Sequence, residues 1–290
     1  MAVARKTVLI TGCSAGGLGA ALAEVFHDKG CHVFATARSP SKIPSSLAKS
    51  PNVTVLTLDV LSPDSIAAAV KSVGAQTEGK LDVLVNNSGS GIILPALDTS
   101  IEGGKKLFDL NFWAALAMIQ AFAPLLVKAK GCIVNNTSVS SVIPIPYNSL
   151  YNASKGALMI ASETWRLELA PLGVRTITLM TGAVKTNFHA NLNLNPTPVP
   201  KDSYYYGVRD VIEGQSDGRM QANGKTPREF AAKVVHEVER GTCGKVWVGG
   251  GAGSARLGSW LLPQSVIDKM VENMIPVSAR IAEDVKNKEI

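Results

Sequence analysis

The chain has 290 residues, of which 46% are hydrophobic and 18% charged, a balance typical of one large domain with a well-buried core. Its net charge of +6 comes from scattered Lys and Arg residues without a long basic run, which argues against a nucleic-acid surface. The four cysteines lie far apart, with no Cys-x-x-Cys pair or Cys/His cluster. We therefore expect neither a metal site nor a disulfide framework.

Short apolar runs alternate with helical patterns along most of the chain. The runs predict strands at residues 7–11, 32–37, 53–59, 81–86, 131–137, 174–180 and 245–248. Helical spacing predicts helices at residues 19–29, 62–76, 100–128, 149–169 and 227–241, with Ser62 as an N-cap and Pro63 in the first turn. Strands buried on both faces are continuously apolar, so the pattern indicates an α/β fold. We expect a doubly wound, Rossmann-type parallel sheet of about seven strands in a three-layer α/β/α sandwich.

The last third of the chain has a looser pattern but no linker, so we expect a single domain over residues 1–290. Residues 189–225 are rich in Asn, Pro, Tyr and Gly, which predicts an irregular lid over the substrate. Tyr204, Tyr205 and Tyr206 either form an aromatic wall for the substrate or pin this lid to the body. His189 either meets an anionic group or is solvated or bonded locally. Residues 263–290 are predicted to form a helical tail.

Surface and membrane signals are limited. The N-terminus lacks an apolar signal core, and no 18 apolar residues follow one another, so we expect a cytoplasmic protein without a membrane span. The segment 107–127 is apolar nearly all round, which predicts a second subunit, in a homodimer or homotetramer. An apolar stripe in the tail either packs against the domain or a partner, or touches a membrane or lipid droplet. It comprises Trp260, Leu261, Leu262, Val266, Ile267 and Met270.

A glycine-rich turn, Thr-Gly-Cys-Ser-Ala-Gly-Gly-Leu-Gly at residues 11–19, joins the first predicted strand to its helix. Glycines let the backbone turn sharply and approach a pyrophosphate, which then lies on the positive N-terminal end of the helix. The spacing leaves open whether Gly16 or Gly17 fills the middle position. The residues expected to bind the dinucleotide here are Gly12, Ser14, Gly17, Leu18 and Gly19.

The end of the second predicted strand indicates which dinucleotide binds. An NAD site has an acidic residue there that accepts a hydrogen bond from the ribose 2′-hydroxyl. This chain has Ala-Thr-Ala-Arg-Ser at residues 35–39, with no acid. The guanidinium of Arg38 is suited to pair with a 2′-phosphate. The sequence therefore predicts NADP(H).

The segment Tyr-Asn-Ala-Ser-Lys at residues 151–155 predicts the catalytic centre. Tyr151 and Lys155 are four residues apart in a helical pattern, so both project from one helix face. A neighbouring ammonium stabilises a phenolate, and we expect Lys155 to lower the pKa of Tyr151. Ser138 lies thirteen residues before the tyrosine, where its hydroxyl can polarise a substrate carbonyl. Ser140 and Ser141 follow the same strand, but the spacing favours Ser138.

These motifs, in this order, resemble those of the short-chain dehydrogenase/reductase family over roughly residues 7–190. The resemblance implies that Tyr151 is the general acid/base, that Ser138 orients the substrate and that Lys155 also holds the nicotinamide ribose. It further implies a proton-relay water at Asn111. Asp59 and Val60 would flank adenine, Asn87 would support the cofactor pocket, and Val184 and Thr186 would contact the nicotinamide carboxamide.

The residues 8–17 and 180–188, read together, resemble a fungal branch of that family typified by an NADPH-dependent 1-acyldihydroxyacetone phosphate reductase. The resemblance implies NADPH-dependent reduction of a small carbonyl compound to an alcohol. The substrate is either of that phosphate-bearing kind or a ketone of fungal secondary metabolism. A phosphate-bearing substrate needs a cationic lid, for which Lys185, Lys201 and Arg209 are candidates. The alternative from another class is an NADP-binding regulatory protein without turnover.

Overall fold

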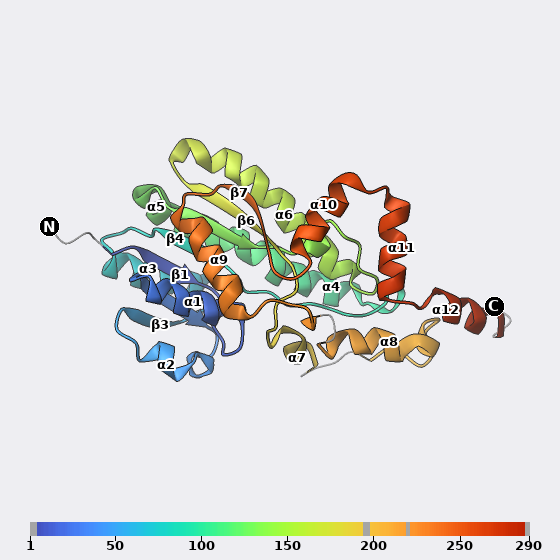
Figure 1. The fold of residues 1–290 in the computed structure, drawn as a ribbon. Coiled ribbons are helices and arrows are strands. Elements are labelled where there is room, and N and C mark those ends of the chain that lie inside the picture. The colour runs from blue at the N-terminus through green and yellow to red at the C-terminus, as the bar shows by residue number, and fades with distance from the viewer. Residues whose placement is uncertain (1–4, 194–197, 219–220, 288–290) are drawn as a thin grey trace.

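The computed structural model describes residues 5–193, 198–218 and 221–287. It contains a seven-stranded sheet in the order β3-β2-β1-β4-β5-β6-β7, in which all neighbouring strands run parallel. Helices cover both of its faces (Figure 1). The predicted α/β, doubly wound, three-layer fold is therefore confirmed.

All seven predicted strands are present, and their ends differ from the prediction by at most two residues. Their bounds are Thr7–Ile10 (β1), His32–Ala37 (β2), Val53–Thr57 (β3), Val83–Asn86 (β4), Cys132–Asn136 (β5), Arg175–Thr181 (β6) and Gly244–Val248 (β7). The strand order grows from β1 towards β3 on one side and towards β7 on the other. The carboxyl ends of β1 and β4 therefore flank the point where the order reverses, which is where ligands bind in open α/β sheets.

The two faces of the sheet explain why the strands are continuously apolar. On one face α1 (Leu18–Asp28) and α9 (Pro227–Glu239) pack over Val8 and Ile10 of β1. On the other face Leu9 packs beneath α3 (Pro63–Gln76) and α5 (Ala114–Ala129), with α6 (Ser149–Leu169) beside them. Side chains of successive strand residues point to opposite faces, so apolar residues are needed at every position.

The helix predicted at residues 100–128 contains an irregular turn that the pattern did not indicate. It consists of α4 (Ile101–Phe108), a π-helical turn at Asp109–Trp113, and α5. By length and composition the run Ile101–Ala129 resembles a membrane-crossing helix. Its apolarity has a simpler cause, because Met118 and Phe122 are buried against the sheet. The wide turn contains Asn111, and such turns are frequent at functional sites.

The predicted lid is more regular than expected. It contains the short helices α7 (Phe188–Asn193) and α8 (Arg209–Glu213), while residues 194–197 and 219–220 lie outside the described part. The ring of Tyr205 packs edge-on against Tyr147, with 5.8 Å between the centroids. Tyr204 is exposed, and Tyr206 lies beneath the guanidinium of Arg209. These contacts favour tyrosines that pin the lid rather than a wall for the substrate.

The C-terminal part holds one helix that the sequence analysis missed. The helix α10 (Ala252–Leu261) precedes α11 (Gln264–Met274) and α12 (Ser278–Asn287), and residues 288–290 lie outside the described part. Its glycines and serines weaken the helical pattern. In α11, Ile267 and Val271 are buried, so the tail packs on its own domain with that side.

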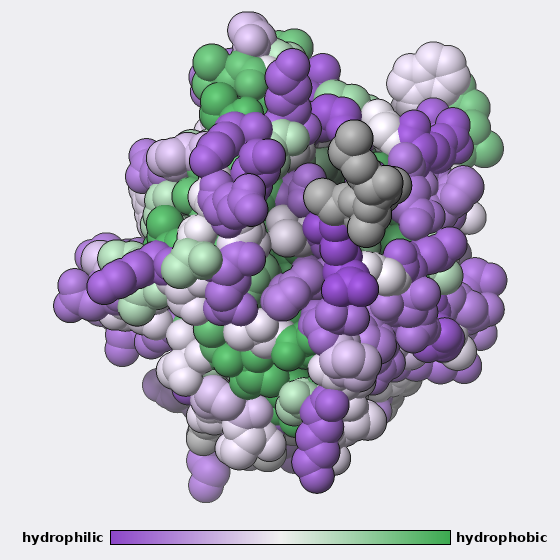
Figure 2. Space-filling view, turned by 90° about the vertical axis from the view of Figure 1, so that its left-hand side faces the viewer, coloured by the Kyte–Doolittle hydropathy of each residue, from purple (hydrophilic) through white to green (hydrophobic). Residues whose placement is uncertain are grey.

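Several apolar side chains of α10 and α11 remain exposed and available to a partner or a lipid surface. They are Leu257, Trp260, Leu261, Val266, Met270 and Met274. By contrast, the face of the molecule at the α2 (Ser45–Ala48) and β3 side is mainly hydrophilic, with smaller hydrophobic areas between polar side chains (Figure 2).

Candidate active site

The backbone conformation of the glycine-rich turn distinguishes Gly16 from Gly17 as its middle glycine. Gly12 and Gly16 both adopt left-handed backbone conformations, each with φ +74°, which glycine tolerates best. Gly17 instead has an extended backbone and is the N-cap of α1. At Gly19 an added Cβ would clash with the carbonyl oxygen of Gly12. Gly16 therefore makes the turn, Gly17 begins the helix, and Gly19 permits the close packing of turn against helix.

This turn suits a dinucleotide phosphate. No side chain of the described residues caps the N-terminus of α1, so within that part of the chain the N–H groups of its first turn, including that of Leu18, have no side-chain partner. Such a terminus attracts an anion through those N–H groups and the helix dipole. The carbonyl oxygen of Ser14 accepts a hydrogen bond from the Gly17 N–H at 3.1 Å, which closes the loop.

Asn187, which lies just before the predicted lid and which the sequence analysis did not single out, contacts this turn. The backbone N–H of Asn187 donates to the carbonyl oxygen of Gly16 at 3.0 Å, and its side chain donates to that of Ala15 at 3.4 Å. The lid and the predicted phosphate site therefore meet directly. An Asn at the start of an irregular segment has no distinguishing sequence signal.

The residues predicted at the adenosine end lie at the carboxyl ends of β2 and β3, which are neighbours. Arg38 is exposed and forms no ion pair with any residue that the structure describes. Val60 is buried, and the carboxylate of Asp59 accepts a hydrogen bond from the Leu61 N–H at 3.0 Å. The guanidinium of Arg38 is thus available to an anion at the sheet edge.

An asparagine that the sequence analysis overlooked, Asn136, joins the glycine turn to Lys155. Its side chain donates to the Oδ1 atom of Asn87 at 3.1 Å, and Asn87 in turn donates to the carbonyl oxygen of Thr11 at 2.9 Å. The carbonyl oxygen of Asn136 accepts from the Nζ atom of Lys155 at 2.9 Å. Its Oδ1 atom accepts from the Thr181 hydroxyl at 2.6 Å. Asn87 therefore bonds directly to the glycine turn, and Asn136 holds the side chain of Asn87 in place.

Asn111 lies in the π-helical turn and is 1% exposed. Its Oδ1 atom accepts from the N–H of Ser90, and its Nδ2 atom donates to the Ser90 carbonyl oxygen and to the Ser154 hydroxyl, each at 2.9 Å. The side chain thus ties the loop after β4 to α6. At Gly89 an added Cβ would lie 3.3 Å from the Nζ atom of Lys155, so a larger residue would crowd the lysine. The role of Asn111 in a water relay stays a prediction.

Ser138 lies near the phenol of Tyr151. Ser138 follows β5 and caps the short 3₁₀ turn Val139–Ser141. Its Oγ atom accepts a hydrogen bond from the Ser140 hydroxyl at 2.9 Å. Its side chain also acts on the Tyr151 phenol in the direction that lowers the pKa of the tyrosine. The structure therefore favours Ser138 over its two neighbouring serines as the partner of Tyr151.

The electrostatics differ from the expectation that Lys155 lowers the pKa of Tyr151. Burial raises the pKa of Tyr151, and this effect exceeds the opposing one of the Ser138 hydrogen bond. Burial also lowers the pKa of Lys155 to about 8. Both shifts have the same physical cause, since removal from water disfavours the charged form of each group. The protein's own groups thus keep Tyr151 as a neutral phenol, and the prediction of a lowered pKa is wrong.

The segment after β6 leads from the sheet into the lid. Val184 is buried, and the hydroxyl oxygen of Thr186 accepts from the Phe188 N–H at 3.3 Å. The ring of Phe188 lies 6.1 Å from that of Tyr151, centroid to centroid, so the lid packs beside the catalytic tyrosine. Burial lowers the pKa of His189, which favours its neutral form and argues against a role in holding an anion.

These groups converge at one edge of the sheet. The glycine turn, Asn87, Ser138 and Val184 follow the carboxyl ends of β1, β4, β5 and β6, while Tyr151 and Lys155 project from α6. No cluster of three or more His, Cys, Asp or Glu side chains that could hold a metal ion occurs among the described residues. The arrangement combines a dinucleotide-binding turn with a neutral phenol, a hydroxyl and a buried lysine.

Comparison with known proteins identifies the class to which this site belongs. The family described as short chain dehydrogenase matches residues 6–197. The chain therefore belongs to the short-chain dehydrogenases, a family of oxidoreductases that act on CH–OH groups.

Individual relatives are fungal and bacterial. The short-chain dehydrogenase ptmH of Penicillium ochrochloron is 42% identical over 275 residues, which cover 94% of this chain and 99% of that protein. The NADPH-dependent 1-acyldihydroxyacetone phosphate reductase of Schizosaccharomyces pombe is also 42% identical, over 72% of this chain and 71% of that protein. The crystal structure of a short-chain dehydrogenase from Streptomyces avermitilis has a TM-score of 0.76 and 26% identity, and covers 93% of this chain and 96% of its own.

The lowered pKa of Lys155 predicts a pH-dependent stability. Between the folded value of about 8 and the usual 10.5, the unfolded chain binds more protons at this lysine, so stability increases with pH across that window. The free energy of unfolding of the wild type should rise by about 3 kcal/mol relative to Lys155→Met from pH 7.5 to pH 10.5. Urea unfolding of both proteins at the two pH values measures this difference. A difference that stays constant with pH would contradict the lowered pKa.

Proposed function

We propose that the protein is an NADPH-dependent carbonyl reductase that converts a ketone or aldehyde to an alcohol. The observation that carries this proposal is the placement of Ser138 beside Tyr151, with Lys155 on the same helix and the glycine turn at the same sheet edge. A regulatory protein without turnover is less well supported, because such a protein has no need for a serine, a tyrosine and a buried lysine together at one site.

The reaction can be derived from these side chains. The hydroxyls of Ser138 and Tyr151 donate hydrogen bonds to the carbonyl oxygen of the substrate and polarise it. Bound NADPH supplies the hydride that the carbonyl carbon accepts. As negative charge develops on the oxygen, Tyr151 gives up its proton to it and becomes a phenolate. Ser138 and the ammonium of Lys155 stabilise that phenolate.

Reduction requires Tyr151 in its protonated form. A proton donor must carry its proton at neutral pH, and burial keeps this phenol neutral. Lys155, with a pKa of about 8, remains mostly protonated at pH 7 and is held towards Asn136 by its hydrogen bond. The lid residue Phe188 covers the tyrosine and helps to exclude water from the reacting oxygen.

Replacing Tyr151 by Phe tests the chemical step. The variant lacks the proton donor, so kcat should fall by about 10²- to 10⁴-fold while NADPH binding changes little. The assay is NADPH oxidation against a panel of carbonyl compounds that includes acylated dihydroxyacetone phosphate and neutral ketones. Tyr204→Phe, in an exposed lid residue, is the matched control and should keep the wild-type rate. Turnover of the Tyr151→Phe variant at a tenth of the wild-type rate or more would refute the mechanism.

NADP(H) is the proposed cofactor because Arg38 is exposed at the end of β2 without a partner ion among the described residues. The NADPH dependence of the Schizosaccharomyces pombe relative also supports it. Replacing Arg38 by Ala removes a charged hydrogen-bond donor, worth about 1.5–3 kcal/mol, and should weaken NADPH binding about 10- to 100-fold. NADH binding should change little. Titration of cofactor fluorescence measures both affinities, with Lys71→Ala on α3 as the control; equal losses for the two cofactors would contradict the assignment.

We also propose that two copies associate through the outward faces of the long helices. Trp113, Ile160 and Leu167 are 54%, 62% and 63% exposed, and all three lie in the π-turn–α5 and α6 region. Leu167→Asp should convert a dimer or tetramer to a smaller species in light scattering, whereas Leu97→Asp, outside these helices, should not. A wild-type monomer would refute the proposal.

The four cysteines are unpaired and Cys243 is exposed, which supports a proposed location in the reducing cytoplasm.

A further inference from the structure

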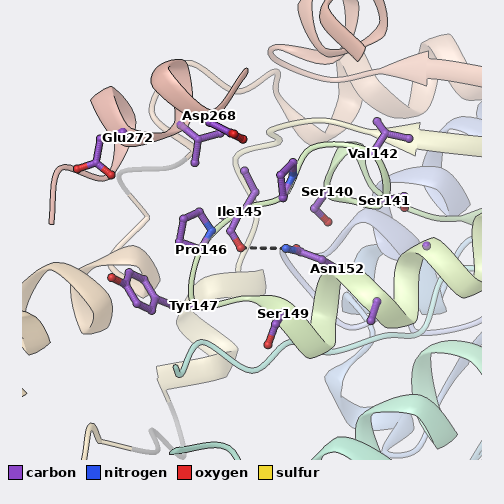
Figure 3. A pocket seen from close by; sticks show the side chains of 14 residues that line it. Ser140, Ser141, Val142, Ile145, Pro146, Tyr147, Ser149, Asn152, Asp268 and Glu272 are labelled. Atoms are coloured by element: carbon purple, nitrogen blue, oxygen red, sulfur yellow. Dashed lines mark hydrogen bonds between the residues drawn. The ribbon is translucent and has the colours of Figure 1, made fainter. Parts of the chain in front are cut away.

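A cavity of about 700 Å³ lies between residues 140–147, the start of α6 and the helix α11 (Figure 3). This volume is within the range of pockets that bind small organic molecules. Its walls include the apolar side chains of Val142, Pro144, Ile145, Pro146 and Val271. Ser138, Tyr151 and Lys155 do not line this cavity.

The cavity is distinct from the reaction cleft. The residues of α6 that line it, Asn152, Ala153 and Gly156, lie on a different helix face from Tyr151 and Lys155. The two sites nevertheless share a wall, because Ser140 lines the cavity and its hydroxyl donates to the Oγ atom of Ser138 at 2.9 Å. A ligand in the cavity that contacts Ser140 would thus be separated from Ser138 by that one side chain.

Two buried polar atoms in the lining have no hydrogen-bond partner among the described residues. The Nδ2 atom of Asn152 donates to the carbonyl oxygen of Ile145 at 2.9 Å, drawn as a dashed line in Figure 3, but its Oδ1 atom has no partner. The Oγ atom of Ser141 is likewise unpartnered. Unsatisfied buried polar groups are unfavourable, so these atoms indicate a ligand with hydrogen-bond donors.

The charges of the lining restrict that ligand further. Asp268 and Glu272 of α11 both border the cavity, and none of its fourteen lining residues is Lys, Arg or His. Hydrogen bonds from Ser278 hold the pKa of Glu272 below its usual value, so it remains a carboxylate. Asp268 accepts from Gln264 at 2.7 Å. Two carboxylates without a neighbouring cation in the lining repel anions and accept hydrogen bonds from hydroxyl groups.

We propose that this cavity is a second ligand site that binds neutral, mainly apolar alcohols or phenols and excludes anions. The ligand's ring or chain packs on the apolar walls, and its hydroxyl donates to Asn152 or Ser141. Through Ser140, the occupant changes the hydrogen bonding of Ser138 and thereby the rate of the reaction. Only this last effect rests on the proposed function, since binding itself does not require turnover.

The binding test compares two probes with the same naphthalene ring, the neutral 2-naphthol and the carboxylate 2-naphthoate, on the full chain saturated with NADPH. Titration calorimetry should show 2-naphthol binding at least tenfold more tightly than 2-naphthoate. Gly156→Leu should weaken 2-naphthol binding at least tenfold by filling the cavity; a Cβ there meets only the Ser141 carbonyl oxygen, at an ordinary 3.8 Å. Gly74→Leu on α3 is the matched control, because an added Cβ there meets nothing within 4 Å.

Ala153→Phe, which fills the same cavity from an exposed position, gives a second test if Gly156→Leu does not fold. Failure of 2-naphthol to bind the wild type, equal binding to every folded variant, or tighter binding of 2-naphthoate would overturn the proposal. In steady-state assays 2-naphthol should alter kcat of the wild type and of Gly74→Leu but not of Gly156→Leu. Purely competitive inhibition against the carbonyl substrate would place the probe in the reaction cleft and would also overturn it. The calorimetry gives its answer even if no carbonyl substrate turns over.

Discussion

The hydrogen bond from Asn136 to Asn87 is the interaction on which the geometry of the site depends. It joins the end of β5 to the end of β4, and through Asn87 it reaches the carbonyl oxygens of the glycine turn after β1. The same asparagine holds Lys155 through its backbone carbonyl oxygen. One residue therefore links the glycine turn to Lys155 through hydrogen bonds. Neighbouring parallel strands make this possible, because they place their carboxyl ends side by side.

Burial determines the chemistry at this site more than the pairing of charges does. Removal from water raises the pKa of Tyr151 and lowers that of Lys155, although the two side chains share a helix face. The site thus holds a proton on the phenol and carries no negative charge on it before the reaction. A neutral phenol suits reduction, in which the negative charge appears only as the hydride arrives.

The sequence predicted the sheet well because its signal is local. A strand buried on both faces must be apolar at each position, so residues 32–37 could be recognised, and β2 has the predicted bounds. The errors occurred where neighbours along the chain do not decide the structure. The π-helical turn at Asn111 depends on contacts with Ser90 and Ser154, and α10 packs beside β7 despite its weak helical pattern. The role of the lid tyrosines could not be predicted either, because it depends on the contact of Tyr205 with Tyr147, a residue distant in the sequence.

For the site, the sequence by itself determined which chemical groups are present and their order: the glycine turn, Arg38, Ser138, Tyr151 and Lys155. Its spacing also favoured Ser138 over Ser140 and Ser141 as the hydroxyl that acts with Tyr151. Only the tertiary structure decided the direction of the pKa shifts, the linking role of Asn136, the contact of Asn187 with Gly16 and the cavity beneath α11. The physical reason is that burial and hydrogen bonds between distant segments arise only when the chain is packed, and local spacing carries no record of them.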